Sequence, residues 1–192
     1  MKTVLFVPGF RETLSTRDYK SAIDAIRDSG YGVKFVPVNW NRTTIDDWLN
    51  ELETEYSKLD PKDTILAGFS FGAMTVYAAA TKQNPAELWL FSLSPYFSED
   101  IHSKDMRKSW LNNIGHRRTS AFGKLNFKKL AKSIHCKTLI FAGEIEINKW
   151  PGMKKRALRA NKLVPNSKLY VVEDVGHDVS DKRYIEAIKQ AI

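Results

Sequence analysis

The stretch Thr64–Gly72 reads TILAGFSFG, and the expected architecture of the chain starts from it. Its apolar part, Ile65–Ala67, is short enough for a buried strand, and the run AMTVYAAATKQ that follows is typical of a helix. Between them, the five residues GFSFG fit the pattern G-x-S-x-G, which forms a sharp turn between a strand and a helix. We therefore expect Ser70 at the apex of a strained turn, with its hydroxyl at the positive end of a helix.

The glycines of this motif have a steric role. Gly68 and Gly72 remove side chains that would otherwise collide inside the turn. The functional interpretation is that Ser70 is a nucleophile, and the alternative is a glycine-rich turn with an inert serine. Ser92 and Ser94 are rival candidates, but no glycines flank them in a comparable turn.

A serine nucleophile needs a base, and the base needs an acid that orients it. Two later apolar runs, Lys137–Ala142 and Lys168–Val172, read as strands. The first ends in Gly-Glu-Ile-Glu, and the second is followed by a loop that contains Gly-His. Serine, acid and histidine in this order, each after a strand, resemble the α/β-hydrolase superfamily. The resemblance covers almost the whole chain, from Val4 to the C-terminal helix.

The resemblance assigns the remaining catalytic roles. In that superfamily the acid follows the penultimate strand and the histidine follows the last one, which are the places of Glu146 and His177. Members of the superfamily more often carry aspartate as the acid. Glu144 is therefore kept as the alternative acid, and Asp174, three residues before His177, comes third.

The turn after the first strand carries the second implied element of the site. The run Val4–Val7 leads directly into Pro8-Gly9-Phe10, where many superfamily members have His-Gly. The resemblance implies that this loop supplies one backbone N–H of an oxyanion hole and that the residue after the serine supplies the other. By position these are Phe10 and Phe71, and Gly9 belongs to the substrate-binding loop.

The rest of the chain alternates helical and strand patterns, which predicts an α/β fold with helices on both faces of a mostly parallel sheet. Because the first strand opens the chain, the antiparallel hairpin that usually begins the superfamily's sheet is missing, and we expect a reduced sheet of about six strands. Further strands are expected at Val33–Val38 and Leu88–Leu93, and helices at Thr16–Ser29, Thr44–Leu59, Lys149–Leu163 and Asp181–Ile192.

Ligands of open α/β sheets bind beyond the carboxyl ends of the strands. Ser94, Tyr96 and Phe97 directly follow the fourth expected strand, so we expect them to contact substrate. Trp150 follows the acid and is expected in a wall of the same pocket.

Residues 98–133 form the least regular stretch, at the place where the superfamily commonly inserts a cap within the single domain 1–192. Two short helices fit it, around Lys104–Asn113 and Asn126–Ser133. Apolar residues alternate there with nine cations, among them Arg107, Arg117 and Arg118. The functional interpretation is a small cap with a basic rim that favours substrates joining an acyl group to an anionic part. The alternative is a solvated basic surface.

The composition suits one globular domain of 192 residues with a formal charge of +8. No zinc-finger, helix-turn-helix or aromatic-basic motif accompanies the charge, so no nucleic-acid partner is expected. The single cysteine, Cys136, fits a reducing compartment, and the apolar run near the N-terminus is too short for a signal peptide. We expect a cytoplasmic monomer or small homo-oligomer that does not insert into membranes.

These patterns predict a serine hydrolase that forms an acyl-enzyme on Ser70 and cleaves a small-molecule carboxylic ester, with thioester and small amide as further options. No metal or organic cofactor is needed for that chemistry. Three alternatives remain open: a non-catalytic binding module of the same fold, an acyltransferase or perhydrolase that uses the same residues, and a nucleic-acid or anionic-surface binder that uses the basic cap.

Overall fold

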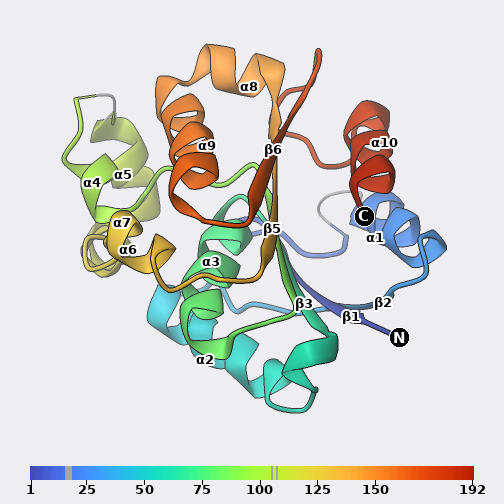
Figure 1. Ribbon diagram of the computed structural model, residues 1–192. Helices are drawn as coiled ribbons and strands as arrows, with labels where there is room; N and C mark the ends of the chain where they lie inside the picture. The colour runs from blue at the N-terminus through green and yellow to red at the C-terminus, as the bar shows by residue number, and fades with distance from the viewer. Residues whose placement is uncertain (16–18, 105, 107) are drawn as a thin grey trace.

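One sheet forms the centre of the molecule. The computed structural model describes residues 1–15, 19–104, 106 and 108–192. Six strands, all parallel, are arranged in the order β2-β1-β3-β4-β5-β6 (Figure 1). Their bounds are β1 Thr3–Val7, β2 Gly32–Phe35, β3 Thr64–Phe69, β4 Glu87–Phe91, β5 Lys137–Gly143 and β6 Ser167–Val172. The expectation of a mostly parallel sheet of about six strands is confirmed.

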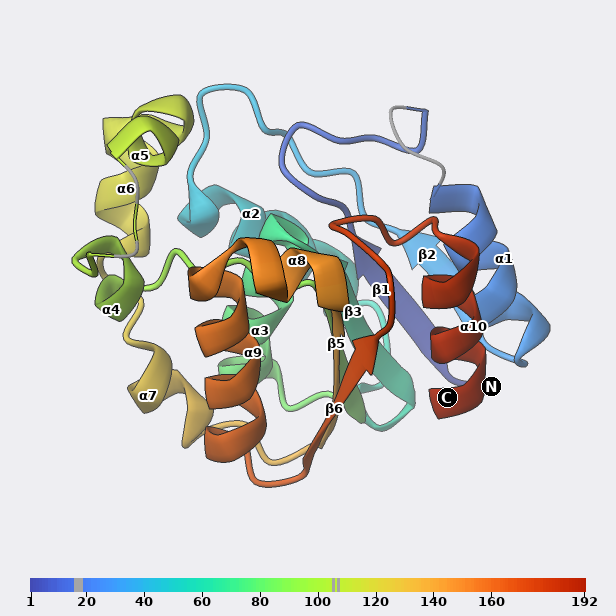
Figure 2. The same cartoon turned by 90° about the horizontal axis from the view of Figure 1, so that it is seen from above.

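Helices cover both faces of the sheet (Figure 2). On one face α1 (Tyr19–Asp28) packs beside α10 (Lys182–Ala191). On the other face lie α2 (Ile45–Tyr56), α3 (Phe71–Gln83) and α9 (Pro151–Leu163). The shorter helices are η1 Pro61–Asp63, α4 Ser98–Ile101, α5 Lys108–Ile114, α6 His116–Phe122, α7 Phe127–Ala131 and α8 Glu144–Lys149. Within the described ranges, none of the helices has the length and apolar character needed to cross a membrane.

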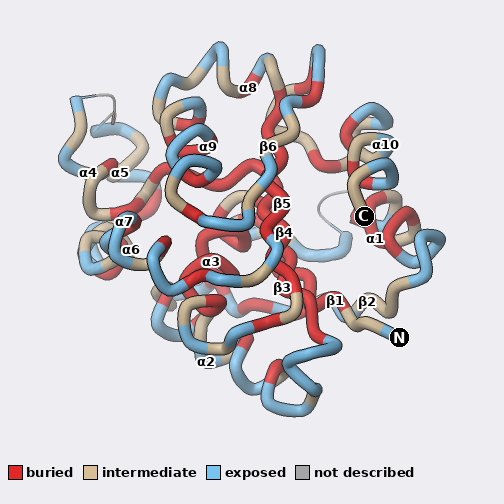
Figure 3. Tube along the Cα trace, viewed as in Figure 1, coloured by how far each residue is buried: buried red, intermediate tan, exposed pale blue. Residues whose placement is uncertain are grey.

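The central strands β1, β3, β4 and β5 are buried on both faces because they are nearly continuous apolar runs, whereas the edge strands β2 and β6 are only partly buried (Figure 3). Successive side chains of a strand point to opposite faces. In β1, Val4 and Phe6 therefore join the core under α1 and α10, while Leu5 and Val7 join the core under α2 and α3. The central strands are therefore held between two apolar cores, one on each face of the sheet. The carboxyl ends of these strands carry the candidate site.

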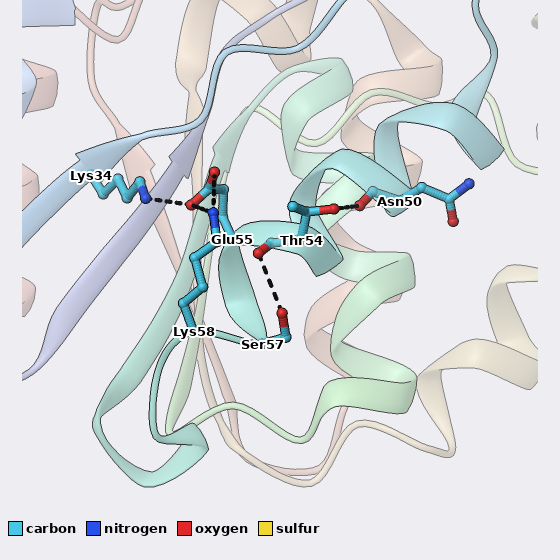
Figure 4. A network of polar contacts seen from close by, with 6 residues as sticks. All are labelled: Lys34, Asn50, Thr54, Glu55, Ser57 and Lys58. Atoms are coloured by element: carbon cyan, nitrogen blue, oxygen red, sulfur yellow. Dashed lines mark hydrogen bonds and ion pairs between the residues drawn. The ribbon is translucent and has the colours of Figure 1, made fainter.

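The edge strand β2 is shorter than predicted, since it ends at Phe35 instead of Val38. It is connected to the end of α2 by charged side chains (Figure 4). Lys34 pairs with the carboxylate of Glu55, and Lys58 contacts the same carboxylate at 3.0 Å. The hydrogen bonds from Lys34 and then Lys58 lower the pKa of Glu55. These exposed pairs contribute little to stability, and β2 is held mainly by its backbone pairing with β1 and by the partly buried Val33 and Phe35.

Two other expectations about elements need correction. Residues 98–133 hold four short helices, α4 to α7, instead of two, and they gather at one side of the molecule in both views (Figures 1 and 2). Helices α5 (Lys108–Ile114) and α7 (Phe127–Ala131) overlap the two predicted ones, whereas α4 and α6 are too short to show a full period of apolar residues and were not predicted. The predicted acid loop is the first turn of helix α8. Residues 16–18 of the first predicted helix and Arg107 of the segment lie outside the described residues.

Candidate active site

Ser70 occupies the turn between β3 and α3. Its backbone has φ 57° and ψ −113°, a conformation that non-glycine residues rarely adopt. The Ser70 N–H donates to the carbonyl of Phe91 at 2.9 Å, which extends the pairing of β3 with β4 up to the turn itself. The predicted strand, sharp turn and helix are therefore present, with the serine at the N-terminal end of a 13-residue helix.

The two motif glycines allow backbone segments to approach closely. A Cβ added to Gly68 would lie 2.4 Å from the carbonyl carbon of Gly72. A Cβ added to Gly72 would lie 2.1 Å from the carbonyl oxygen of Val7. Because backbone atoms cannot move aside as side chains do, no larger residue fits at either position without displacing the turn.

Three side chains from distant parts of the chain form one line of hydrogen bonds. His177 Nε2 lies 3.0 Å from Ser70 Oγ, and His177 Nδ1 lies 3.0 Å from Glu146 Oε1. The Glu146 side chain is fully buried, whereas the His177 side chain is 27% exposed. The His177 ring also packs on Phe69, with ring centroids 4.7 Å apart. This is the spatial order of nucleophile, base and orienting acid.

The buried carboxylate of Glu146 has further partners. Glu146 Oε2 accepts hydrogen bonds from Ser92 Oγ at 2.8 Å and from the Gly143 N–H at 3.2 Å. Ser92 uses its single hydroxyl hydrogen for the carboxylate, so the Tyr184 hydroxyl, 3.2 Å away, donates to Ser92. Burial and then the charge of Glu146 raise the pKa of Tyr184 well above its usual value, which keeps that donor protonated. The carboxylate of Glu146 is therefore held through both oxygens: Oε2 by Ser92 and the Gly143 N–H, and Oε1 by His177.

The close contact of two loops brings Glu146 to His177. A Cβ on Gly143 would lie 2.3 Å from the carbonyl oxygen of Val175, so glycine is needed where the loop after β5 meets the loop after β6. The Ile145 N–H donates to the same carbonyl at 2.9 Å. Glu144, the alternative acid, accepts instead from the Asp174 N–H at 3.1 Å. Of the two candidate acids, Glu146 is the one that contacts His177.

Two backbone N–H groups lie where the sequence places an oxyanion hole. Phe71 is the first residue of α3, and Phe10 follows β1 in the loop beside it. Within the described part of the chain, neither N–H has a hydrogen-bond acceptor. The Phe10 and Phe71 rings pack together with centroids 5.1 Å apart. Gly9 has another role, because its N–H donates to the Tyr19 hydroxyl at 2.8 Å.

A cavity of about 280 Å³ opens above Ser70 and His177. Aromatic and apolar side chains dominate its walls, which suits a small apolar acyl group. Burial raises the pKa of Tyr96 to about 12, so its hydroxyl stays protonated there. The lining residues are Phe10, Ser70, Phe71, Ser94, Pro95, Tyr96, Trp110, Asn113, Ile114, Trp150, Met153 and His177.

Among the predicted substrate contacts, Ser94, Tyr96 and Trp150 line this cavity, whereas Gly9 and Phe97 do not. Ser94 Oγ lies only 3.0 Å from Ser70 Oγ. Phe97 is fully buried, and its ring packs on the rings of Tyr77 and Phe127. The prediction that Phe97 contacts substrate is wrong because the chain turns inward after Tyr96, into the core under α7.

Sequence reasoning missed several residues of the site. The sequence pattern presents Ser92 only as a rival nucleophile, yet it binds the acid. Tyr184, within the last expected helix, is not singled out by any pattern, yet its hydroxyl contacts Ser92. A polar residue at the end of an otherwise apolar buried strand was the available signal for Ser92. Trp110, Asn113 and Ile114 come from α5, which lies in the expected cap, but no pattern singled them out as residues of the cavity.

The architecture can be compared with that of known proteins. Est1E from Butyrivibrio proteoclasticus matches 99% of this chain and 84% of its own length, with a TM-score of 0.79 at 15% identity. A bromoperoxidase from Bacillus anthracis matches 97% of this chain and 90% of its own length, with a TM-score of 0.72 at 15% identity. The carboxylesterase CesB from Bacillus subtilis matches 98% of this chain and 81% of its own length, with a TM-score of 0.66 at 15% identity.

The chain has the α/β-hydrolase fold. The similarity is structural, since no family model matches the sequence and no curated protein matches it significantly. In an α/β-hydrolase fold the carboxyl ends of the central strands face one crevice, where strand order reverses. Here that point lies between β1 and β3, which end in the loops that carry Phe10 and Ser70.

Proposed function

We propose that the protein is a serine hydrolase that cleaves carboxylic esters through an acyl-enzyme on Ser70. The observation that carries this proposal is the continuous line of hydrogen bonds from Glu146 through His177 to Ser70. The strained turn at Ser70 and the apolar cavity above it support the same conclusion. The hydrolases and esterases with the same fold add support at the level of fold alone.

In the first half of the proposed reaction, Ser70 Oγ attacks the acyl carbonyl while His177 Nε2 takes its proton. Glu146 keeps the imidazole oriented and stabilises the positive charge that develops on it. The carbonyl oxygen becomes an oxyanion, and the N–H groups of Phe10 and Phe71 are the proposed donors to it. His177 then gives its proton to the departing alkoxide, so an alcohol leaves and the acyl group stays on Ser70.

In the second half, a water molecule attacks the acyl-enzyme. His177 takes a proton from this water, a second tetrahedral oxyanion forms, and its collapse releases the carboxylic acid and returns the proton to Ser70. Residues 98–133 are proposed to act as a cap, since α5 contributes Trp110, Asn113 and Ile114 to the cavity. The cavity volume of about 280 Å³ favours short acyl chains over long ones.

Hydrolysis of p-nitrophenyl acetate, butyrate and octanoate tests the proposal. The wild type is expected to turn over the shorter esters, and Ser70→Ala to lower kcat by roughly 10³-fold or more. Ser94→Ala is the matched control, because its hydroxyl lies beside that of Ser70, and it is expected to retain turnover. If the wild type hydrolyses none of the three esters, the hydrolase proposal fails and a binding role for the same cavity takes its place.

A further inference from the structure

Four arginines gather on the Phe10 side of the catalytic cavity. Arg11 follows Phe10 in the chain, Arg42 precedes α2, and Arg117 and Arg118 lie on α6. The guanidinium carbons of Arg11 and Arg118 each lie 5.0 Å from the centroid of the Phe10 ring. We call this group the arginine pocket. It joins three segments that are far apart in the sequence, so no single sequence pattern contains it.

The arginine pocket is hollowed and adjoins the catalytic cavity. One depression of about 310 Å³ is lined by Arg42, Arg117 and Arg118 and shares Ile114 with the catalytic cavity. A second depression of about 640 Å³ is lined by Arg11, Arg42 and Arg118. The two depressions share Arg42 and Arg118, and Ile114 lines both the first depression and the catalytic cavity, so the arginines lie next to the cavity.

Specific contacts hold the pocket in shape. Arg118 donates to the carbonyl oxygens of Trp40 at 2.6 Å and of Ile114 at 3.1 Å. Arg117 donates to the carbonyl oxygen of Arg42 at 3.2 Å. These hydrogen bonds join α6 to the loop that carries Arg42, so Arg42, Arg117 and Arg118 keep a fixed arrangement relative to one another.

The backbone of the pocket is strained. Arg11 has φ 61° and Arg42 has φ 55°, in the left-handed region that side chains disfavour. Such a conformation costs on the order of 1 kcal/mol per residue and is found most often at functional sites. Both residues stand in loops that line the second depression.

Among the described residues, no acidic side chain pairs with the arginines of the pocket. In the described ranges, no carboxylate oxygen lies within 4.0 Å of a nitrogen of these four arginines. Glu12, the acidic residue next to Arg11, is hydrogen-bonded to the Tyr19 hydroxyl. Burial and then the charges of Arg11 and Arg117 lower the pKa of Arg118. Like charges held this close without a partner favour the binding of an anion.

We propose that the arginine pocket binds an oxyanionic group, a carboxylate or a phosphate, on the ester that the Ser70 site cleaves. Guanidinium groups suit this ligand because their paired N–H donors match two oxygens of a carboxylate or phosphate. The inference rests on the proposed ester hydrolysis and narrows its substrate to acidic esters. An anion in the pocket would be separated from the acyl carbon by the Phe10 ring, so a linker of a few atoms connects the two groups.

Matched substrates test this assignment. The ratio of kcat/KM for the mono-p-nitrophenyl ester of adipic acid to that for p-nitrophenyl hexanoate measures the preference for a carboxylate. The ratio for 4-acetoxyphenyl phosphate to 4-methoxyphenyl acetate measures the preference for a phosphate. We expect at least one ratio to exceed about ten, which corresponds to one charge-assisted hydrogen bond, and to fall as salt is added.

Variants test whether the arginine pocket is the source of the preference for anionic esters. Arg11→Gln/Arg42→Gln is expected to reduce the preferred ratio about ten-fold, mainly through KM. The control Arg159→Gln/Lys162→Gln removes the same charge from the exposed face of α9 and is expected to leave the ratio unchanged. Neutral esters hydrolysed with no anionic preference, or a preference that the control reduces equally, would overturn the inference while leaving the proposed function intact.

A binding measurement tests the arginine pocket in the case that the proposed ester hydrolysis fails. If no ester is hydrolysed, calorimetric titration with adipate and with inorganic phosphate tests the pocket directly. Binding of either anion by the wild type that weakens in Arg11→Gln/Arg42→Gln, and not in the control, supports an anion site in a protein that is not an esterase. Absence of binding overturns the inference together with the proposed function.

Discussion

The turn around Ser70 and the 98–133 segment hold their functional side chains by different means. In the turn, backbone lies against backbone, so that a Cβ on Gly72 would come within 2.1 Å of the Val7 carbonyl oxygen. In the segment, side chains make the connections: Asp100 forms a buried ion pair with Arg156 of α9, and its neighbour Glu99 accepts the N–H of Phe127 at 3.0 Å.

The difference suggests how such a molecule can vary. The geometry around the nucleophile depends on residues that cannot be replaced, because only hydrogen fits between the backbones. The segment depends on pairs of side chains, which other pairs of similar volume can replace. Substrate range can therefore change in the segment while the reacting groups stay in place.

The largest effect is expected at the turn. Gly72→Ala places a methyl group against the backbone carbonyls of Val7 and Pro8, so we expect the variant to lose its folded state or to unfold at a much lower temperature. Gly123→Ala in the segment is the control, since its nearest contacts are at 3.4 Å and its φ is −59°, and it is expected to cost less than about 1 kcal/mol. Thermal unfolding by circular dichroism measures both. Equal melting temperatures would contradict the comparison.

The next effect concerns the acid. Glu146→Gln removes the buried charge that faces His177 Nδ1, so kcat for p-nitrophenyl butyrate is expected to fall by roughly 10³ to 10⁴-fold. Glu144→Gln, two residues away, alters only the contact with the Asp174 N–H and is expected to change kcat less than about three-fold. Steady-state kinetics distinguish the two glutamates. A larger loss in Glu144→Gln would mean that the acid is assigned to the wrong residue.

A stability change is expected in the segment. Asp100→Asn leaves the Arg156 guanidinium, whose side chain is fully buried, without its charge partner, and should lower the free energy of unfolding by about 3 to 5 kcal/mol. The double variant Asp100→Leu/Arg156→Met replaces the pair by apolar groups and is expected to recover most of the loss. Urea unfolding measures both variants. A single variant as stable as the wild type would show that the pair does not hold the segment.

The smallest effect is expected at Ser92. Ser92→Ala removes one donor to the Glu146 carboxylate, so kcat should fall about ten-fold while KM and the melting temperature change little. Tyr184→Phe, which leaves the Ser92 hydroxyl in place, is the milder comparison. If the variant loses activity only because its melting temperature falls, Ser92 stabilises the fold and does not position the acid.

The sequence was most informative where function and folding use the same local pattern. The strands β3, β4 and β5 are short apolar runs, and the glycines that flank Ser70 reveal a turn that no other residue allows. The parallel α/β sheet followed from the alternation of strand and helix patterns, and the number of about six strands followed from the resemblance; both are confirmed. The placements of His177 and Glu146 came from the resemblance, which puts an acid and a histidine after the last two strands. In the structure His177 contacts Ser70, and Glu146 contacts His177.

Features that depend on contacts between distant segments were not predictable. Phe97 follows a strand end, as Tyr96 does, yet it turns into the core because Tyr77 and Phe127 receive its ring. The roles of Ser92 and Tyr184 depend on where the Glu146 carboxylate lies after folding. The arginine pocket likewise forms only when the loops after β1 and β2 meet α6. A linear pattern contains none of these distances.

The central claim is that Ser70 is an activated nucleophile, and labelling with a fluorophosphonate probe tests it most directly. Mass spectrometry of the digested protein is expected to find the adduct on Ser70, with labelling lost in Ser70→Ala, strongly slowed in His177→Ala and retained on Ser70 in Ser94→Ala. An adduct on Ser94, or a folded wild type that the probe does not label, would contradict the claim.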